Sequence, residues 1–377
     1  MARPVRAFLA FLAIWLVACT GTAPPTGSAP AAPSASPKEP WEQDWDRLVE
    51  AAKREGRVAV AGIQGEDNRV ALTEAFEKKY GITVDYVGVG GPELPPRVSN
   101  ERSAGIYEWD VFIAGTTTLI RGLKPIGALQ PLEPAFMLPE VSDKAKWRGG
   151  TLPYMDSDQH VISLLRRAGQ YFYVNTNMVK PEEFKSWRDL LDPKWKGKIV
   201  VGRDPMVAGY GRAMFLFFYL HPQMGQDFIR EFARQDIQML RDDRTAAQWL
   251  AQGRMPLCFC SNVEIDKLRE DGLPVSVVEP KFMREGSHTT SGPANIALAD
   301  HPAHPNAAKL YLNWVLSKDG GALISKSMGD PSTRVDVPTD QTNAWVVPDP
   351  AWRVTNDEDA LTYEEPLLTF LAEVFGR

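Results

Sequence analysis

The alternation of strand-like and helix-like segments is the feature that most constrains how this chain can fold. Residues 58–63, 82–87 and 109–114 are short apolar runs of the kind that form buried strands. Apolar residues at helical spacing precede and follow the first of these runs, and Gly81 marks a left-handed helix end. Parallel strands joined by helices build an α/β sheet that is covered on both faces. We therefore expect an α/β fold with its ligand site beyond the carboxyl ends of the strands.

The alternation returns in the second half of the chain. The chain has 377 residues, which is more than one hydrophobic core usually spans, so we expect two or three globular units. A strand at 292–298, followed by a helix that starts in a proline-rich segment, precedes the C-terminal region. The other segments predicted here are strands at 171–175, 198–201, 256–260 and 275–278 and a strongly apolar helix at 207–219.

The charge balance excludes binding of polyanions by bulk charge. There are 42 Lys and Arg residues against 48 Asp and Glu residues, a formal net charge of −6 that would repel nucleic acid or an anionic membrane surface.

The three cysteines are too few for a disulfide-rich scaffold. The enzyme motifs GxSxG, HExxH, GxxxxGK[ST] and GxGxxG are absent from the sequence.

The first forty residues predict export and a lipid anchor. Residues 1–18 carry Arg3 and Arg6 before an apolar run too short to cross a bilayer, as in a signal peptide. The run ends in the letters LVAC, which resemble a bacterial lipobox with Cys19 as the lipidated residue. An ordinary secretory signal with an incidental cysteine is the alternative. Residues 19–40 are rich in Pro, Ala and Ser, which predicts an extended tether that holds an extracytoplasmic protein on the cell membrane.

An ordered set of segments resembles the extracellular solute-binding proteins of bacterial ABC importers, in particular the branch that includes ferric-iron-binding proteins. The resemblance covers most of residues 41–340. It implies a periplasmic-binding-protein-like fold of type II, with two α/β lobes joined by hinge strands, ligand closed between them, and delivery to an ABC permease and its ATPase. The segments that carry it, after the lipobox and tether, are WDRLVEAAKREGRVAV, LTEAFEKKYGITVDY, YEWDVFIAG, YFYVNTNMV and HPNAAKLYLNWVLSKDGGALI.

The resemblance implies that the chain forms lobe 1, then lobe 2, and then passes back into lobe 1. The hinge candidates are residues 173–176 and 291–295, which include Tyr173 and Asn175. The expected boundaries are 41–172 for lobe 1, 173–290 for lobe 2, 291–340 for the return with a C-terminal helix, and 341–377 for an extension that packs on the lobes.

Candidate ligand-binding residues come from segments that follow predicted strands. Thr116, Thr117 and Thr118 open a helix, where hydroxyl and free N–H groups can receive an anion, although a plain N-cap is an equal alternative. Tyr210, Gly211 and Arg212 open the apolar helix of the second lobe, where Gly211 could admit a ligand, Tyr210 stack and Arg212 pair with an anion. Asn262 follows a predicted strand, and Arg334 lies on a loop that relatives of this branch bring toward the cleft.

Ferric iron is the other candidate solute. Iron binders of the family commonly place two adjacent tyrosines a little after the strand that here ends in PLCFCSNVEIDKL, but no tyrosine in this sequence adjoins another. Tyr171 and Tyr173 share one face of a strand, and aromatic packing is the favoured interpretation for that pair. The missing tyrosine pair therefore argues against direct binding of ferric iron, and we expect no metal site formed by side chains of the protein.

Other conspicuous residues have structural explanations. Cys258 and Cys260 are two apart on a strand, and we expect two buried thiols rather than a disulfide or a metal pair. His301 and His304 fit the entry to a helix. We expect Trp249 and Trp314 to lie in the core.

The sequence thus predicts a monomeric, lipid-anchored receptor that captures a small anionic or polar organic solute, or a ferric iron complex, without a cofactor and without catalysis. Two alternatives stay open at this point. One is a ligand-sensing lipoprotein that docks on a receptor, and the other is an exported enzyme on the same fold, because fold alone does not decide function.

Overall fold

The computed structural model describes residues 38–376, apart from residues 208 and 341. Residues 40–377 form a compact unit by themselves. The predicted signal peptide, Cys19 and nearly all of the predicted tether lie outside the described residues. Within the described part of the chain, no helix has the length and apolar character needed to cross a membrane.

The first sheet has the strand order β2-β1-β3-β13-β4, with β5 beside β13. Strands β1, β2 and β3 are parallel, and Val60 of β1 pairs with Tyr86 on one side and Val111 on the other. Strand β13 returns from far along the chain and runs antiparallel to β3. The bounds are β1 Arg57–Gly62, β2 Thr83–Gly88, β3 Val111–Ala114, β4 Leu129–Gln130, β5 Ile162–Ser163 and β13 Asn295–Ala299.

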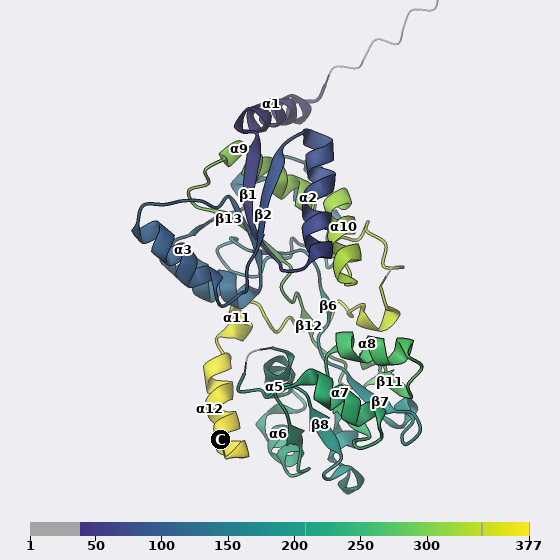
Figure 1. Ribbon diagram of the computed structural model, residues 1–377. Coiled ribbons are helices and arrows are strands. Elements are labelled where there is room, and N and C mark those ends of the chain that lie inside the picture. The colour runs from purple at the N-terminus through teal and green to yellow at the C-terminus, as the bar shows by residue number, and fades with distance from the viewer. Residues whose placement is uncertain (1–37, 208, 341, 377) are drawn as a thin grey trace, which may run out of the picture. The chain divides into compact units, whose positions relative to one another are not determined.

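Helices from both ends of the chain cover this sheet. Helix α1 contacts α9, and α2 lies beside α10 (Figure 1). Helix α2 ends at Tyr80 because Gly81 takes a left-handed conformation, with φ of 70°, that most residues avoid. Phe76 of α2 packs against Tyr311 and Trp314 of α9 in the core. The bounds are α1 Pro40–Glu55, α2 Glu66–Tyr80, α3 Leu94–Ser103, α4 Pro139–Ser142, α9 Pro305–Leu316 and α10 Lys318–Met328.

The second sheet has the order β11-β7-β10-β8-β9, in which β8, β9 and β10 are parallel and β7 is antiparallel to both neighbours. Its core is rich in aromatic residues, with Phe172 and Trp187 among those that are fully buried. The bounds are β7 Phe172–Asn175, β8 Ile199–Val201, β9 Gln238–Met239, β10 Leu257–Phe259, β11 Val275–Val278, α5 Tyr210–Leu220, α6 Gly225–Ala233, α7 Asp243–Ala251 and α8 Asn262–Glu270.

Short helical segments fill many of the connections. One of them, Thr117–Leu123, is a π-helix directly after β3. The others are 3₁₀ turns at Lys124–Ile126, Glu133–Ala135, Lys144–Lys146, Pro181–Glu183, Trp187–Leu191, Pro193–Trp195, Pro280–Phe282 and Ala344–Val346.

A small two-stranded sheet carries the chain between the two larger sheets. Strand β6, Arg167–Ala168, pairs antiparallel with β12, Thr289–Thr290. Residues 173–175, the first hinge candidate apart from Thr176, lie inside β7 of the second sheet. The chain therefore passes from the first sheet to the second at β6, a few residues before the first hinge candidate. It returns at β12, directly before the second hinge candidate at residues 291–295.

The C-terminal segment packs on both halves of the unit. Trp345 and Val346 join the core on one face of the second sheet. Helix α12, Glu364–Phe375, lies against α5 and α6 (Figure 1). The preceding α11, Glu358–Leu361, buries Leu361 in a core cluster of the first sheet.

Candidate functional site

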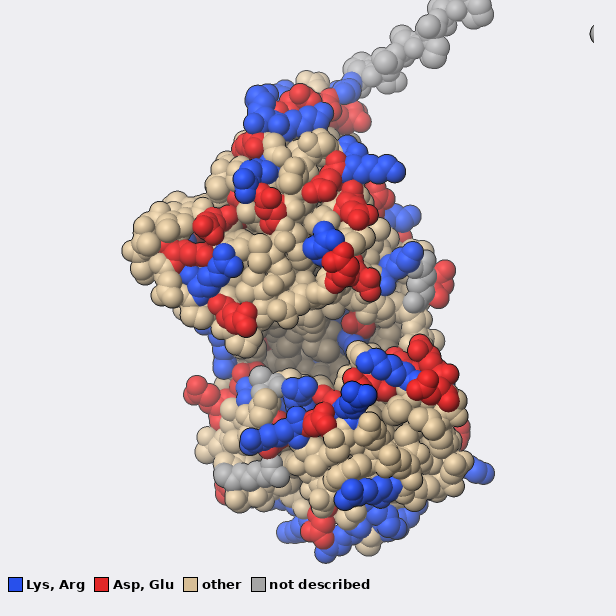
Figure 2. All heavy atoms as spheres, in the orientation of Figure 1, with Lys and Arg blue, Asp and Glu red and all other residues tan. Residues whose placement is uncertain are grey.

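A cavity of about 900 Å³ has walls from both large sheets and from the C-terminal segment. It opens as a hollow on the face of the molecule shown in Figure 2. The first wall follows β3, and the second wall follows β8 and β10, so both walls lie at the carboxyl ends of parallel strands. This is the place where open α/β sheets bind ligands, because the loops there diverge to neighbouring helices.

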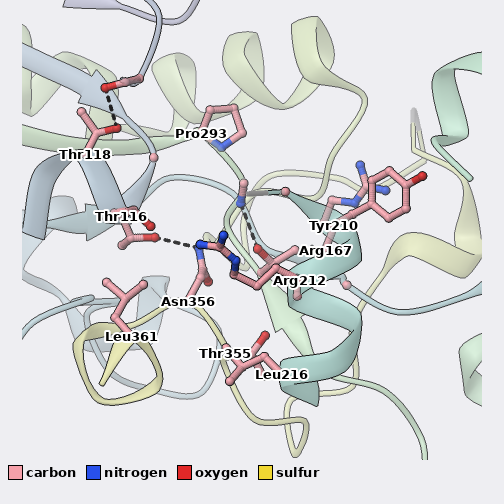
Figure 3. A pocket seen from close by; sticks show the side chains of 18 of the residues that line it. Thr116, Thr118, Arg167, Tyr210, Arg212, Leu216, Pro293, Thr355, Asn356 and Leu361 are labelled. Atoms are coloured by element: carbon pink, nitrogen blue, oxygen red, sulfur yellow. Dashed lines mark hydrogen bonds between the residues drawn. The ribbon is translucent and has the colours of Figure 1, made fainter. Parts of the chain in front are cut away.

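The three predicted threonines lie in the first wall. Thr116 is buried and its hydroxyl oxygen accepts a hydrogen bond of 2.9 Å from Asn356 Nδ2 (Figure 3). The Thr118 hydroxyl donates to the carbonyl of Gly91 at 3.2 Å. Thr117 is exposed and also lines the cavity. The threonines thus present polar oxygens to the cavity from one short segment.

Tyr210 and Arg212 lie in the second wall, at the first turn of α5. The Tyr210 hydroxyl hydrogen-bonds to the carboxylate of Asp243, and burial raises the pKa of Tyr210 well above its ordinary value. Arg212 reaches toward Thr116 and Asn356, as Figure 3 shows, while its Nη2 donates to the carbonyl of Met206 at 3.0 Å. Tyr210 is therefore a neutral hydrogen-bonding ring, and Arg212 is a fixed cation.

Asn262 opens α8 at the same wall. It follows Cys260 and Ser261, which also line the cavity. Ser261 is the N-cap residue of α8, but its side chain makes no capping bond to the helix.

Arg167 is a cation of the cavity that sequence reasoning missed. It lies in β6, and its Nη1 is 3.4 Å from Asp330 Oδ1, while its Nη2 donates to the Tyr171 hydroxyl. Burial opposes the charge on Arg167, but Tyr171 and Asp330 outweigh burial and raise its pKa above the ordinary value. Burial raises the pKa of both Tyr171 and Asp330. Nothing in the local sequence around Arg167 distinguishes it from neighbouring Arg166, which does not line the cavity.

The C-terminal segment supplies a third wall that sequence reasoning also missed. Thr355, Asn356, Leu361 and Glu364 all line the cavity. The sequence predicts that this segment packs on the lobes but assigns it no part in binding. Its polar residues are spaced irregularly and are far in sequence from the other walls, so no local pattern marks them.

Four predicted site residues do not line the cavity. Tyr173 is fully buried in β7, and Asn175 donates from Nδ2 to the carbonyl of Leu250 at 2.8 Å. Gly211 packs so closely on Arg203 that an added Cβ would lie 2.0 Å from its carbonyl oxygen. The small size of Gly211 therefore serves helix packing rather than ligand access.

Arg334 is the fourth of these residues, and the expectation that it reaches the cleft is not met. Its side chain is 1% exposed, and it is paired with Glu140 at 2.8 Å and with Asp336 at 2.9 Å. Its Nη1 also donates to the carbonyl of Leu316 at 2.9 Å. A buried guanidinium needs partners for its donors, and these groups satisfy Arg334 inside the first half of the unit.

Cys258 and Cys260 form a disulfide, so the expectation of two free thiols is wrong. Their Cα atoms are 5.5 Å apart, which lies within the range that a disulfide requires. The expectation assumed an extended strand through both residues, but β10 ends at Phe259. Cys260 lies beyond the strand, where the backbone is free to bring the two side chains together.

The described residues contain one group with metal-ligand spacing, formed by Asp156, Asp158 and His160. The Lys124 ammonium lies 3.0 Å from Asp156 and 2.9 Å from Asp158, so a cation of the chain already pairs with these carboxylates and offsets part of their charge. His304 lies at the entry to α9, as predicted, with its Nδ1 2.8 Å from Asp110 Oδ2.

The two separate α/β sheets and the cavity lined from both define the class of two-lobed periplasmic binding proteins of type II. Residues 71–353 match the family described as bacterial extracellular solute-binding protein, and the chain belongs to this family. The family consists of extracytoplasmic solute-binding transport proteins, which are not enzymes. The predicted fold class, family and absence of catalysis are thereby confirmed.

Several proteins show how this chain relates to others. An uncharacterized protein of Haemophilus influenzae is 24% identical over 265 residues, which cover 67% of this chain and 71% of the relative. The Trichodesmium protein IdiA (FutA), solved with iron and citrate, has a TM-score of 0.66 and 19% identity over 85% of this chain and 99% of that one. AfuA of Actinobacillus pleuropneumoniae, solved with fructose-6-phosphate, has a TM-score of 0.60 and 18% identity over the same two shares. At these identities the solved structures establish the fold.

Proposed function

We propose that this protein is the receptor of an ABC importer and that its solute is a small organic molecule with an anionic group. The observation that carries the proposal is the cavity lined by three arginines, Arg121, Arg167 and Arg212. Two carboxylates, Asp330 and Glu364, line the same cavity, so the charged side chains leave one net positive charge. The threonine hydroxyls, Tyr171, Tyr210, Asn262 and Asn356 can donate or accept hydrogen bonds to the rest of the solute.

An anionic solute fits this cavity better than a bare ferric ion does. Ferric iron prefers anionic oxygen ligands such as tyrosine phenolates. Burial raises the pKa of Tyr171 and of Tyr210, which opposes phenolate formation at both rings. Iron would therefore enter as an anionic complex that the arginines can hold. The protein solved with iron and citrate and the one solved with fructose-6-phosphate share this fold, so both kinds of anion belong in a binding screen.

The experiment is a thermal-shift screen followed by calorimetry on purified wild-type protein. The screen contains ferric citrate, inorganic phosphate, hexose phosphates, sulfonates, thiamine and polyamines. An anion is expected to stabilise the protein, because a ligand that binds only the folded state adds RT ln(1 + [L]/Kd) to its stability. Arg167→Ala and Arg212→Ala should each weaken that anion by about 2 kcal/mol or more.

Arg334→Gln is unsuitable as a control, because Arg334 is buried in ion pairs and its loss would destabilise the protein. Arg188→Gln is the matched control, because Arg188 is an exposed arginine of the second half that does not line the cavity. If the solute that binds is cationic or uncharged, and neither Arg167→Ala nor Arg212→Ala changes its affinity, the proposal of an anionic solute is wrong. A hit weakened by both cavity substitutions but not by Arg188→Gln supports it.

The lobes and hinge form part of the same proposal. We assign residues 41–172 and 291–340 to lobe 1, residues 173–290 to lobe 2, and residues 341–377 to an extension over both. The hinge is best placed at the β6–β12 ladder, which joins the two large sheets. Closure there would bring Arg167 and Tyr171 toward the solute together with the threonine wall.

We also propose that residues 1–18 are a signal peptide and that Cys19 carries a lipid anchor, with residues 19–40 as its tether. The protein would then act as a monomer beside its permease on the outer face of the membrane or in the periplasm. A Cys19→Ala variant should lose the acyl chains and leave the membrane fraction, which metabolic labelling with a fatty acid and fractionation would detect. Acylated Cys19→Ala protein in the membrane fraction would overturn the anchor.

A further inference from the structure

The C-terminal segment is held in place on both sides of the cavity. The Glu358 backbone N–H donates to the carbonyl of Met155 at 2.8 Å, and the Glu358 carboxylate accepts from Lys124 at 2.7 Å. On the other side, α12 buries Leu367 and Leu371 in the aromatic core beneath α5 and α6. Glu364, the first residue of α12, is therefore fixed between the two attachments.

The Glu364 carboxylate lies between two of the three cavity arginines. Its Oε2 is 3.2 Å from Arg121 Nη1 and 3.8 Å from Arg212 Nη1. Arg121 belongs to the π-helix after β3, and Arg212 belongs to α5 in the other half. One carboxylate of the protein thus bridges guanidinium groups from the two halves, and all three side chains line the cavity.

Among the described residues, Glu364 is the one charged partner of these two guanidinium groups, and their other acceptors are neutral carbonyl oxygens. Arg121 Nη2 donates to the carbonyl of Leu361, and Arg212 donates to the carbonyls of Pro205 and Met206. These bonds orient the arginines but do not neutralise them. Glu364 therefore occupies the position in which a solute oxyanion would be bound by both arginines.

We infer that Glu364 determines the specificity of the cavity by competing with the solute for Arg121 and Arg212; this inference rests on the proposed function. A solute anion must displace the Glu364 carboxylate, so an anion with a single weak contact gains little from the exchange. An oxyanion with several acceptor oxygens, such as a phosphate group, contacts both guanidinium groups at once, and these contacts replace the ion pairs that Glu364 loses. Glu364 thus selects multidentate oxyanions and excludes simple monocarboxylates.

The test compares wild-type protein with Glu364→Gln and Glu364→Ala, using inorganic phosphate and acetate as probes in calorimetry. Both substitutions remove the competing charge, and a hydrogen bond to a charged group is worth enough that phosphate affinity should rise about tenfold. Acetate binding, which we expect to be undetectable in the wild type, should become measurable in both variants. Glu365→Gln is the matched control, because Glu365 is the exposed neighbour on the same helix and should leave both affinities unchanged. Thermal unfolding checks that each variant is folded, and agreement between Gln and Ala guards against a local packing effect.

Unchanged phosphate affinity in both Glu364 variants, with Arg212→Ala still weakening binding of the screened solute, would overturn the inference and leave the proposed function intact. Phosphate binding that appears only in the Glu364 variants would support the inference. If no anion stabilises the wild type or either variant, the proposed function fails and the inference fails with it.

Discussion

Lys124 and Glu358 form the contact that ties the C-terminal segment to the first half of the unit. Lys124 Nζ is 2.7 Å from Glu358, and the Glu358 carboxylate also accepts from the N–H and the hydroxyl of Ser157, each at 2.8 Å. Partial burial opposes ionisation, but these donors outweigh burial and lower the pKa of Glu358 from 4.5 to about 2. The ionised form is therefore the one that the folded protein stabilises.

Glu358→Gln should lower the free energy of unfolding by about 1–2 kcal/mol at pH 7, because it removes charge-assisted hydrogen bonds at a partly exposed site. A carboxyl whose pKa is lower in the folded state stabilises the fold above its ordinary pKa, and that stabilisation disappears as the pH falls toward about 2. The difference between wild type and variant should thus be smaller at pH 3 than at pH 7. Urea unfolding at both pH values measures it, with exposed Glu365→Gln as control. An equal difference at the two pH values would contradict this account.

Single residues also show where prediction from sequence ends. Arg212 and Arg334 are both arginines that the sequence analysis assigns to the binding site, yet Arg212 lines the cavity and Arg334 is buried with Glu140 and Asp336. The partners that decide between these fates are up to 194 residues away in sequence for Arg334. Neither local spacing nor residue type contains that information.

At the scale of elements, the disulfide at the end of β10 joins residues only two apart. It follows Leu257, which pairs with Ile199 in the sheet, and it precedes Asn262 at the start of α8. Cross-linking restricts the unfolded chain less when the closed loop is short. We therefore interpret this disulfide as a constraint on the cavity wall rather than on the whole fold.

Reducing the Cys258–Cys260 disulfide should lower the free energy of unfolding by only about 1–2 kcal/mol. Urea unfolding with and without a phosphine reductant measures the change, and alkylation followed by mass spectrometry verifies the redox state. The third cysteine, Cys19, is replaced by Ala in both samples so that it does not take part. A loss well beyond about 3 kcal/mol would show that the bond stabilises more than its own short loop.

The long elements follow from periodicity, and the short ones do not. Helix α2 ends before Gly81 and strand β11 spans residues 275–278, both as predicted from the apolar pattern and the helix-ending glycine. The apolar helix predicted at 207–219 begins at Tyr210, since Gly209 has φ of 122° and stands outside the helix. The two-residue strands β6 and β12 have no periodicity to read, because each exists only through pairing with the other.

At the scale of the whole compact unit, two sheets with separate cores share a cavity and a small ladder of two strands. A solute that touches both walls stabilises whichever arrangement brings the walls together. The C-terminal segment contacts both halves of the unit, so we expect it to limit how far the two walls of the cavity can move relative to each other.

Binding of the screened anion should therefore make the protein more compact in solution. Small-angle X-ray scattering with and without the anion measures the radius of gyration, which should fall on binding. Arg212→Ala, which lacks one wall of the contact, should show a smaller change at the same anion concentration. An unchanged radius of gyration at saturation would indicate that the solute binds without closure.

The sequence by itself determined the α/β class, the family and the order of the long strands and helices. These follow from periodicity and from segments read in order, which are properties of neighbouring residues. Only the tertiary structure decided that β13 runs antiparallel beside β3, that Arg167 and Glu364 line the cavity and that Arg334 does not. The physical reason is that a binding site is a set of distances between distant segments, and those distances exist only after the cores of both sheets have formed.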